Sequence, residues 1–312
     1  MTRLVQLSGV CADLVYRVEA VPAPGSDAVV RGAALMTAGG GFNAMVAARR
    51  AGLPVAYAGT LGTGPLADVC AAGLAGQGIE TLRPRKAGMD QGCCTVLVDA
   101  TGERTFIASE GADGEVSDAD LAGLHLPTED WLLISGYCLT YAGSRAALTR
   151  WLQRHRGLNL LFDPCPQVAL IPPETLAAVM RAAAWVSANA TEAAFLTGLS
   201  DPAEAAEALA RGRKGALVRS GGKGCHLALP GHPARHIPPH RVDAIDTNGA
   251  GDCHTGYFLA LLARGTPPDR AARLANIAAA LSTTTEGPAT APDLSSVLAA
   301  AALSPNTTGG TP

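Results

Sequence analysis

The chain has 312 residues, of which 48% are hydrophobic and 16% are charged, and its formal net charge is −3. At roughly 100–200 residues per domain, this length allows one large α/β domain or two small ones with a sizeable core. The acidic charge balance and the aromatic content of 4% argue against nucleic acid as a partner, because nucleic-acid sites need basic patches or stacking rings.

Two features of the sequence bear on where the protein works. The N-terminal segment has no long apolar run typical of a signal peptide, since Asp13 interrupts it, and no run of about 18 apolar residues elsewhere would span a membrane. The eight cysteines form no CxxC pattern and have no zinc-type spacing to histidine, which favours buried, reduced thiols. We therefore expect a cytoplasmic protein that makes no contact with a membrane.

Apolar runs of strand length alternate with Ala- and Leu-rich stretches of helical length along the chain. The expected buried strands are Arg3–Gly9, Val55–Gly59, Trp131–Ser135, Asn159–Asp163, Ala184–Ser187 and Gly215–Arg219. The expected helices are Phe42–Gly52, Pro65–Gln77, Gly143–Arg156, Glu174–Met180, Pro202–Ala210 and Asp269–Thr285. This alternation implies parallel crossovers and helices on both faces of one sheet.

Two regions interrupt the alternation of strands and helices. Residues 14–36 contain short β-like segments around a Pro-Ala-Pro-Gly turn, and residues 91–109 form a predicted hairpin around Asp-Ala-Thr-Gly. Neither region contains a crossover helix, so we expect a small separate sheet that projects from the main one. Residues 304–312 have no apolar anchor and are expected to be disordered, which leaves residues 1–303 as the folded domain.

The segment Asp246–Leu262, DTNGAGDCHTGYFLALL, predicts a Gly-rich turn followed by a helix that begins at residues 249–251. The first N–H groups of a helix have no intrahelical partner and the helix dipole is positive there, so the turn favours an anion such as phosphate. Asp252 lies beside that anion, where it is placed to accept the proton of a hydroxyl that attacks a phosphoryl group. Alternatively, Asp252 is only a favourable first-turn acid.

Residues 246–252, DTNGAGD, resemble the C-terminal DTxGAGD signature of the PfkB/ribokinase family of carbohydrate kinases. The resemblance implies a three-layer α/β/α sandwich with a mainly parallel central sheet and a small β-sheet lid. It implies that Asp252 is the general base of an ATP-dependent kinase and that Thr247 lies at the nucleotide. It also implies that the anion hole for the transferred phosphate consists of Gly249, Ala250 and Gly251.

A second Gly-rich segment, Gly39-Gly40-Gly41-Phe42-Asn43, precedes a predicted helix. By itself such a loop also suits a dinucleotide, although the GxGxxG spacing is absent. The segment resembles the N-terminal signature of the same family, which implies that Gly40, Gly41 and Asn43 bind sugar hydroxyls. Asp13 resembles an acid that joins them in binding the sugar, and the alternative is that it is a polar strand terminus.

Three further segments resemble the nucleotide side of this family. Asn189 to Glu192 resembles an NxxE motif, which implies Asn189 at the nucleotide and Glu192 holding Mg²⁺ through water; a plain helix cap is the alternative. Residues 218–224 resemble a strand followed by a GxxG turn and add Gly221, Gly224 and Arg219, where Arg219 either reaches ATP phosphates or is solvated. Asn276 lies where relatives have a residue near the adenine.

Other segments depart from the usual pattern of the family. Residues 283–292 replace a loop that in many relatives helps bind a monovalent cation, so activation by K⁺ stays open. Arg104, in a hairpin that resembles the lid, either contacts the substrate or is an exposed lid charge. Tyr137 ends the segment ISGY, where many ribokinases carry a sugar-contacting acid that is lacking here, so we expect Tyr137 in a pocket unlike the usual ribose pocket.

The combination of these segments resembles YegV-like sugar kinases within the family. It implies transfer of the γ-phosphate of ATP to a hydroxyl, such as a primary CH₂OH, of a sugar or sugar-like small molecule. Two alternatives stay open, a nucleoside kinase of the same family and a non-catalytic sugar-sensing protein on the same scaffold. Because lid strands often form part of a dimer interface in relatives, a homodimer through the lid is a further expectation.

Overall fold

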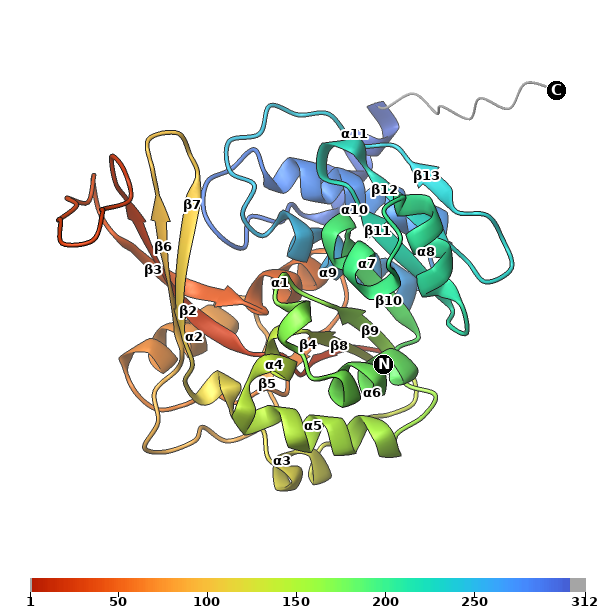
Figure 1. Ribbon diagram of the computed structural model, residues 1–312, viewed down its shortest axis with the longest axis horizontal. Helices are drawn as coiled ribbons and strands as arrows, with labels where there is room; N and C mark the ends of the chain where they lie inside the picture. Colours follow the sequence, from red (N-terminus) through yellow and green to blue (C-terminus); the bar gives the residue numbers. More distant parts are fainter. Residues whose placement is uncertain (1, 304–312) are drawn as a thin grey trace.

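Two β-sheets organise the chain in the computed structural model, which describes residues 2–303 (Figure 1). One sheet has nine strands and the other has four, and the smaller sheet projects from the body of the molecule, at the left of Figure 1. The prediction of a disordered tail at residues 304–312 lies outside the described residues. The three-layer α/β/α fold with a lid sheet is confirmed.

The nine-stranded sheet forms the middle layer of the body. In spatial order it consists of β13 (Arg235–Ile237), β12 (Cys225–Ala228), β11 (Gly215–Arg219), β10 (Trp185–Asn189), β9 (Asn159–Asp163), β8 (Trp131–Ser135), β1 (Leu4–Gln6), β4 (Val55–Tyr57) and β5 (Glu80–Thr81). All pairs from β5 to β11 are parallel, whereas β12 and β13 continue the sheet as antiparallel strands. The carboxyl ends of the parallel strands therefore meet at one edge, where α/β proteins place their ligands.

Helices cover both faces of this sheet because its inner strands are apolar on both sides. Along β8, Trp131 and Leu133 join the core under one face, and Leu132 and Ile134 join the core under the other. The first face packs against α1 (Phe42–Arg50), α2 (Pro65–Gly76), α9 (Ala250–Ala263), α10 (Pro268–Ser282) and α11 (Leu294–Leu303). The second packs against α3 (Asp118–Ala122), α4 (Tyr137–Thr140), α5 (Ala142–Arg154), α6 (Pro173–Ala182), α7 (Ala190–Thr197) and α8 (Pro202–Ala210).

The four-stranded sheet is the predicted lid. Its order is β3 (Leu35–Gly40), β2 (Val10–Arg17), β6 (Cys93–Val98) and β7 (Arg104–Ser109). β2 begins earlier than residue 14, where the sequence placed the lid, because the chain leaves β1 at Gln6 and re-enters β structure at Val10. Figure 1 shows these strands running from the body into the lid. Between β1 and β2 the chain thus passes directly from the central sheet into the lid.

Membrane insertion through a helix finds no support in the structure. None of the helices within residues 2–303 is both long and apolar enough to cross a bilayer.

Candidate functional site

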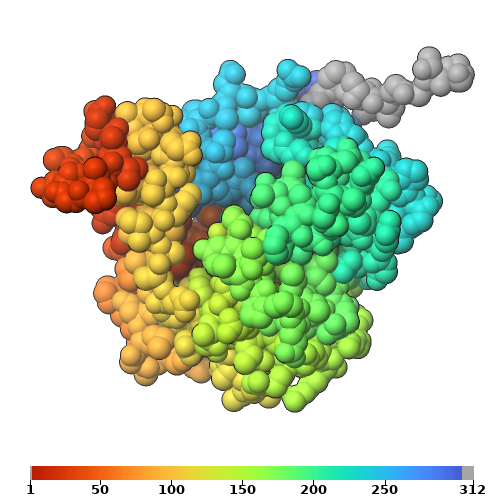
Figure 2. Space-filling model, in the orientation of Figure 1, coloured from red at the N-terminus to blue at the C-terminus, as the bar shows by residue number. Residues whose placement is uncertain are grey.

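Two predicted site residues, Asn189 and Arg219, end neighbouring strands of the large sheet. Ser135, Asp163, Asn189 and Arg219 are the last residues of β8, β9, β10 and β11, and the pairing places Ser135 opposite Asp163 and Asn189 opposite Arg219. The same edge faces the lid and the start of α9. Figure 2 shows the surface hollowed between the yellow lid residues and the green and blue segments, with red N-terminal residues at its floor.

The turn before α9 has the geometry of an anion site. Gly249 adopts φ +71°, a left-handed conformation that favours glycine, and α9 begins at Ala250 as predicted. The Asp246 carboxylate accepts a hydrogen bond from the Asn248 backbone N–H at 2.8 Å, which fixes the turn. Within residues 2–303 no acceptor pairs with the backbone N–H groups of Gly251 and Asp252. These donors at the helix start are therefore free for an anion.

Asp252 is held by a residue from the other Gly-rich segment. Asn43 in α1 donates from Nδ2 to Asp252 Oδ2 at 3.3 Å, and its Oδ1 accepts from the Ala289 backbone N–H at 3.0 Å. Burial, followed by the charge of Asp163, raises the pKa of Asp252 to about 7, although the Asn43 hydrogen bond and Arg219 oppose the shift. Asp252 is therefore an oriented carboxylate that gains or loses its proton near neutral pH.

Asp13 lies in the lid sheet, where the glycines of β3 make room for it. A Cβ atom on Gly39 would lie 2.1–2.3 Å from the Asp13 carboxylate, and a Cβ atom on Gly41 would lie 2.4 Å from Gln6 Nε2. Asp13 is 6% exposed, and burial raises its pKa to about 6. The alternative that Asp13 is a polar strand terminus is wrong, because it sits within β2 with its carboxylate against the Gly-rich segment.

Comparison with known proteins identifies the family. Residues 1–294 match the family described as pfkB family carbohydrate kinase. The chain belongs to this family. It is 30% identical over 274 residues to the uncharacterized sugar kinase YegV of Escherichia coli K12, covering 86% of this chain and 84% of that protein. It is 26% identical over 293 residues to ribokinase of Haemophilus influenzae, covering 91% and 93%.

A solved structure of a family member supports the same fold. The crystal structure of ribokinase from Thermotoga maritima superimposes with a TM-score of 0.80 at 23% sequence identity, covering 97% of this chain and 100% of that one. At this identity the likeness concerns the fold. As a member of this family, the protein is a carbohydrate kinase.

A cavity of about 380 Å³ contains three of the residues predicted for the nucleotide, Asn189, Arg219 and Gly221. Lys223, which was not predicted, also lines it. Gly224 does not, and it has a packing role instead, since a Cβ atom there would lie 2.2 Å from the Ile237 carbonyl oxygen. The cavity lies between the start of α7 and the turn that joins β11 to β12.

Two other residues predicted for the nucleotide lie elsewhere. Thr247 is exposed in the turn before α9. Asn276 is 8% exposed, donates from Nδ2 to the carbonyl oxygens of Ile237 and Pro238 at 3.1 and 3.0 Å, and pairs through Oδ1 with His254 Nε2 at 3.0 Å. The Asn276 amide therefore fixes α9 and the chain after β13 to α10, and its hydrogen-bonding atoms are used inside the protein.

Asn189 and Glu192 form a reciprocal cap at the start of α7. Asn189 Oδ1 accepts from the Glu192 N–H at 2.8 Å, and Glu192 accepts from the Asn189 N–H and from its Nδ2, both at 2.8 Å. The helix-cap alternative for these residues is therefore correct as a description of the local structure. Burial and Asp163 raise the pKa of Glu192 to about 7, against Arg219 and the Asn189 N–H.

Arg219 is neither solvated nor extended into the nucleotide cavity as a free cation. Its side chain is 12% exposed and forms a two-atom contact with Asp163, at 3.1 and 3.3 Å. The same guanidinium donates to the Gly251 carbonyl oxygen at 2.8 Å and to Thr255 Oγ1 at 2.6 Å, and it lies 3.8 Å from Glu192. Arg219, at the end of β11, thus joins the end of β9 to the first turns of α7 and α9.

Sequence reasoning missed Asp163 and Thr255 as members of this cluster. Thr255 donates to Asp163 Oδ2 at 2.8 Å and lies 3.2 Å from Ser187 Oγ. The sequence did contain one signal, because Asp163 ends a predicted buried strand. A charged side chain without a partner is energetically costly there. Among the described residues there is no group of three or more His, Cys, Asp or Glu side chains arranged to hold a metal ion.

Arg104 begins the lid strand β7, and Tyr137 begins α4 in the body. The alternative of an exposed lid charge is wrong for Arg104, because it is 17% exposed and pairs with Asp246, which is 9% exposed, at 2.5 Å. Tyr137 is 40% exposed. Burial of its hydroxyl, with the nearby charges of Cys165 and Asp252, raises the pKa of Tyr137. Tyr137 therefore lies near Asp252, and Arg104 joins the lid to the turn before α9.

Proposed function

We propose that the protein transfers the γ-phosphate of ATP to a hydroxyl, such as a primary CH₂OH, of a sugar or sugar-like molecule, with Asp252 as general base. One observation carries the proposal. Asp252, oriented by Asn43, lies in the first turn of α9 beside the unpartnered N–H groups of Gly251 and Asp252 itself. A proton acceptor and a phosphate-binding helix start thus occupy the same place.

The acceptor side follows from the residues around Asp252. The acceptor hydroxyl lies against the Asp252 carboxylate, which takes its proton as the hydroxyl oxygen attacks the γ-phosphorus of ATP. The bond from that phosphorus to the oxygen of the β-phosphate breaks, and ADP leaves with the electron pair. A base with a pKa of about 7 is well matched to this step near neutral pH. Asp13, Gly40 and Gly41 hold the remaining hydroxyls from the lid side, and Asn43 keeps the carboxylate aimed at the acceptor.

The donor side follows from the 380 Å³ cavity beyond the start of α9. ATP lies there along Asn189, Gly221 and Lys223, with its γ-phosphate at the N–H groups of Gly249, Ala250 and Gly251. There the phosphate replaces the Thr247 carbonyl oxygen, which accepts from the Ala250 N–H at 3.4 Å. Those N–H dipoles stabilise the charge that develops on the transferred group, and they need no reorganisation during the reaction.

Mg²⁺ would be held by Glu192 through water. Both Glu192 oxygens accept hydrogen bonds from Asn189, and each keeps a lone pair that suits a metal-bound water better than direct coordination. When bound, Mg²⁺ neutralises charge on the ATP phosphates. The nearby Arg219 limits the negative charge that the buried Glu192 carboxylate presents on its own.

Other expectations stand apart from this core proposal. A monovalent cation is not part of it, because Asp246, the carboxylate that accepts from Gly287 in the 283–292 loop, is paired with Arg104. A cytoplasmic location accords with eight free cysteines. The homodimer through the lid stays a prediction.

A non-catalytic sensor would not require an oriented base beside free N–H donors, so we favour the enzyme.

Asp252→Asn tests the proposal. With an acceptor that the wild type phosphorylates in an ADP-coupled assay, we expect kcat to fall by about 10²–10⁴-fold, the usual contribution of a general base. Asp243→Asn, an exposed aspartate on the chain before the turn, is the matched control and should keep full turnover. Turnover of Asp252→Asn close to the wild type would overturn the assignment.

A further inference from the structure

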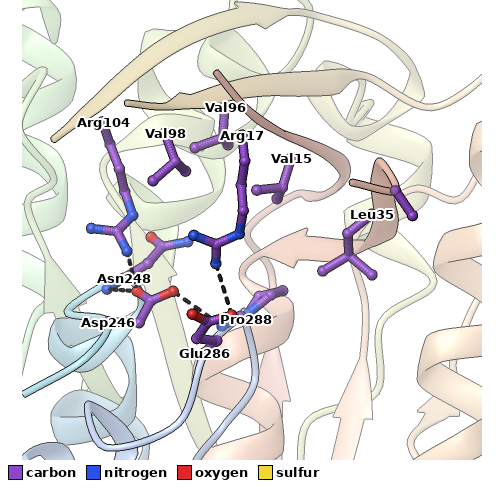
Figure 3. Close-up of a pocket in the computed structure, with 12 residues that line it drawn as sticks. Val15, Arg17, Leu35, Val96, Val98, Arg104, Asp246, Asn248, Glu286 and Pro288 are labelled. Carbon is purple, nitrogen blue, oxygen red and sulfur yellow. Dashed lines mark hydrogen bonds and ion pairs between the residues drawn. The ribbon is translucent and has the colours of Figure 1, made fainter. Parts of the chain in front are cut away.

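A second cavity, of about 230 Å³, lies between the lid and the loops that flank the start of α9 (Figure 3). Its lid side is lined by aliphatic side chains from three strands, Val15 in β2, Leu35 in β3, and Val96 and Val98 in β6. Leu35 Cδ2 reaches to 3.9 Å from the position of a Cβ atom on Gly287, so it bridges the two sides of the cavity.

This cavity continues the acceptor site. Val15 pairs with Leu35 and Val96, and Asp13 pairs with Thr37 and Cys94, two positions earlier in β2. Side chains two residues apart share a face of a strand and are separated by about 7 Å. The lid therefore presents one continuous inner surface to the hollow, with a carboxylate at one end and aliphatic side chains at the other.

The opposite side of the cavity is polar, and its charges are balanced. Arg104 pairs with Asp246, and Arg17 pairs with Glu286 at 2.9 Å. The Asn248 side-chain amide lines the cavity and has no hydrogen-bond partner in the described part of the chain. Figure 3 shows it between the two arginines, below the valines. The cavity thus offers an unused donor and acceptor beneath an apolar surface.

Size and charge restrict what can occupy this space. The volume of 230 Å³ is roughly eight times the share of one water molecule in the liquid, so it exceeds what one hydroxymethyl group needs. A charged occupant would have to separate an arginine from its carboxylate. A neutral group with apolar faces and a hydrogen-bonding edge instead contacts the valines with its face and Asn248 with its edge.

We infer that this cavity holds a neutral heterocyclic substituent of the acceptor, so that the preferred acceptor is a nucleoside-like riboside and not a free sugar. The inference rests on the proposed function, because it takes the reacting hydroxyl to lie at Asp252. In a riboside, the hydroxymethyl group and the heterocycle leave the sugar ring on opposite sides of its ring oxygen. With the hydroxymethyl group at Asp252, the ring contacts Asp13 and the heterocycle extends under Val15 and Val96 toward Asn248.

Leu35→Trp tests the inference by filling the cavity from a half-exposed position. Met36→Trp is the matched control, because Met36 is the next residue of β3, is similarly exposed and points to the other face of the lid. The probes are ribonucleosides with purine and pyrimidine bases, and ribose as the acceptor without a base. We expect wild-type kcat/KM to favour one or more nucleosides over ribose, and Leu35→Trp to lower that ratio by about tenfold or more. Met36→Trp should keep it.

Calorimetric binding of the same compounds gives a readout that does not depend on catalysis. We expect nucleosides to bind the wild type more tightly than ribose does, and Leu35→Trp to lose this difference. A ratio unchanged by Leu35→Trp, or nucleosides that bind no better than ribose, would overturn the inference. If no acceptor yields ADP, the proposed function fails, and the binding data still decide whether the cavity takes the heterocycle.

Discussion

Arg219 in the body and Arg104 in the lid both pair with an aspartate, but in different ways. Arg219 contacts Asp163 through two atoms and also bonds to Gly251 and Thr255, so it ties several elements of the body to the start of α9. Arg104 has one ion-pair partner, Asp246, and that contact joins the lid to the body. The donor side of the site is thus built as a fixed block, and the acceptor side is closed by contacts that can separate.

Removal of Arg219 tests the fixed block and should have the largest effect. Arg219→Thr leaves the buried Asp163 without its partner, so we expect the free energy of unfolding to fall by about 3–5 kcal/mol in urea titrations. Adding Asp163→Asn should restore more than half of the loss. Arg235→Thr, in an exposed pair with Asp269, is the control and should cost about 0–1 kcal/mol. A double variant no more stable than Arg219→Thr would contradict this interpretation.

The pH dependence of kcat/KM tests the electrostatics of the same block. Because burial and Asp163 raise the pKa of Asp252 to about 7, its basic form is lost as the pH falls below that value. We expect log kcat/KM to decrease with a slope of one or steeper, so that activity at pH 5 is roughly 100-fold below that at pH 8. Arg104→Gln, which changes only the lid, should leave this acid limb in place. A flat profile between pH 5.5 and 8 would exclude Asp252 as the base.

Gly39→Ala tests how closely the lid fits around the acceptor. The added Cβ atom would lie 2.1–2.3 Å from the Asp13 carboxylate, so the carboxylate must move away from the acceptor. Overpacking of this kind costs about 1–3 kcal/mol, and we expect KM for the acceptor to rise about tenfold while KM for ATP stays constant. Gly222→Ala, which has open space for its Cβ atom, is the control. An unchanged acceptor KM would show that Asp13 does not contact the acceptor.

Arg104→Gln tests the separable contact and should have the smallest effect. Without Arg104 the Asp246 carboxylate keeps its hydrogen bonds from the Asn248 and Gly287 N–H groups, so it is not left without partners. Loss of the ion pair favours lid opening, and we expect the acceptor KM to rise about two- to fivefold, which is equivalent to about 0.4–1 kcal/mol. Hydrogen exchange of β7 should increase, and exchange of α9 should not. Arg150→Gln, in an exposed pair with Asp118, is the control and should change neither. If α9 exchanged faster as well, the lid and the body would not be separate in the way we describe.

Local sequence predicted the turns of the site well, because the chemistry of a few neighbouring residues determines them. The Gly-rich turn before α9 starts its helix at the expected place, and Asn43 follows the expected glycines. The partners of these residues were not predictable in the same way. Asn43 and Asp252 are 209 residues apart, and Arg104 and Asp246 are 142 apart. Such contacts depend on strand order and lid position, which no single segment encodes.

Arg219 shows the same limit within the large sheet. The sequence placed it correctly at the end of β11, and placed Asp163 at the end of β9. What brings them together is β10, which lies between those two strands in the sheet. The strand order is not visible in the sequence, so Arg219 could be interpreted only as solvated or as a phosphate contact. Its buried pair with Asp163 could not be foreseen.

The chain passes directly from β1 in the body into β2 in the lid, so the acceptor site is divided between the two parts. This division disfavours the transfer of phosphate to water. Asp13 belongs to the lid sheet, whereas Asn43 and Asp252 belong to the body. A molecule that touches both parts at once holds the lid shut, and only an acceptor with several hydroxyls spans that distance. A lone water molecule reaches one part only, so the ion pairs between lid and body receive no help from it. We therefore expect closure to be incomplete without an acceptor and ATP to survive until a true acceptor arrives.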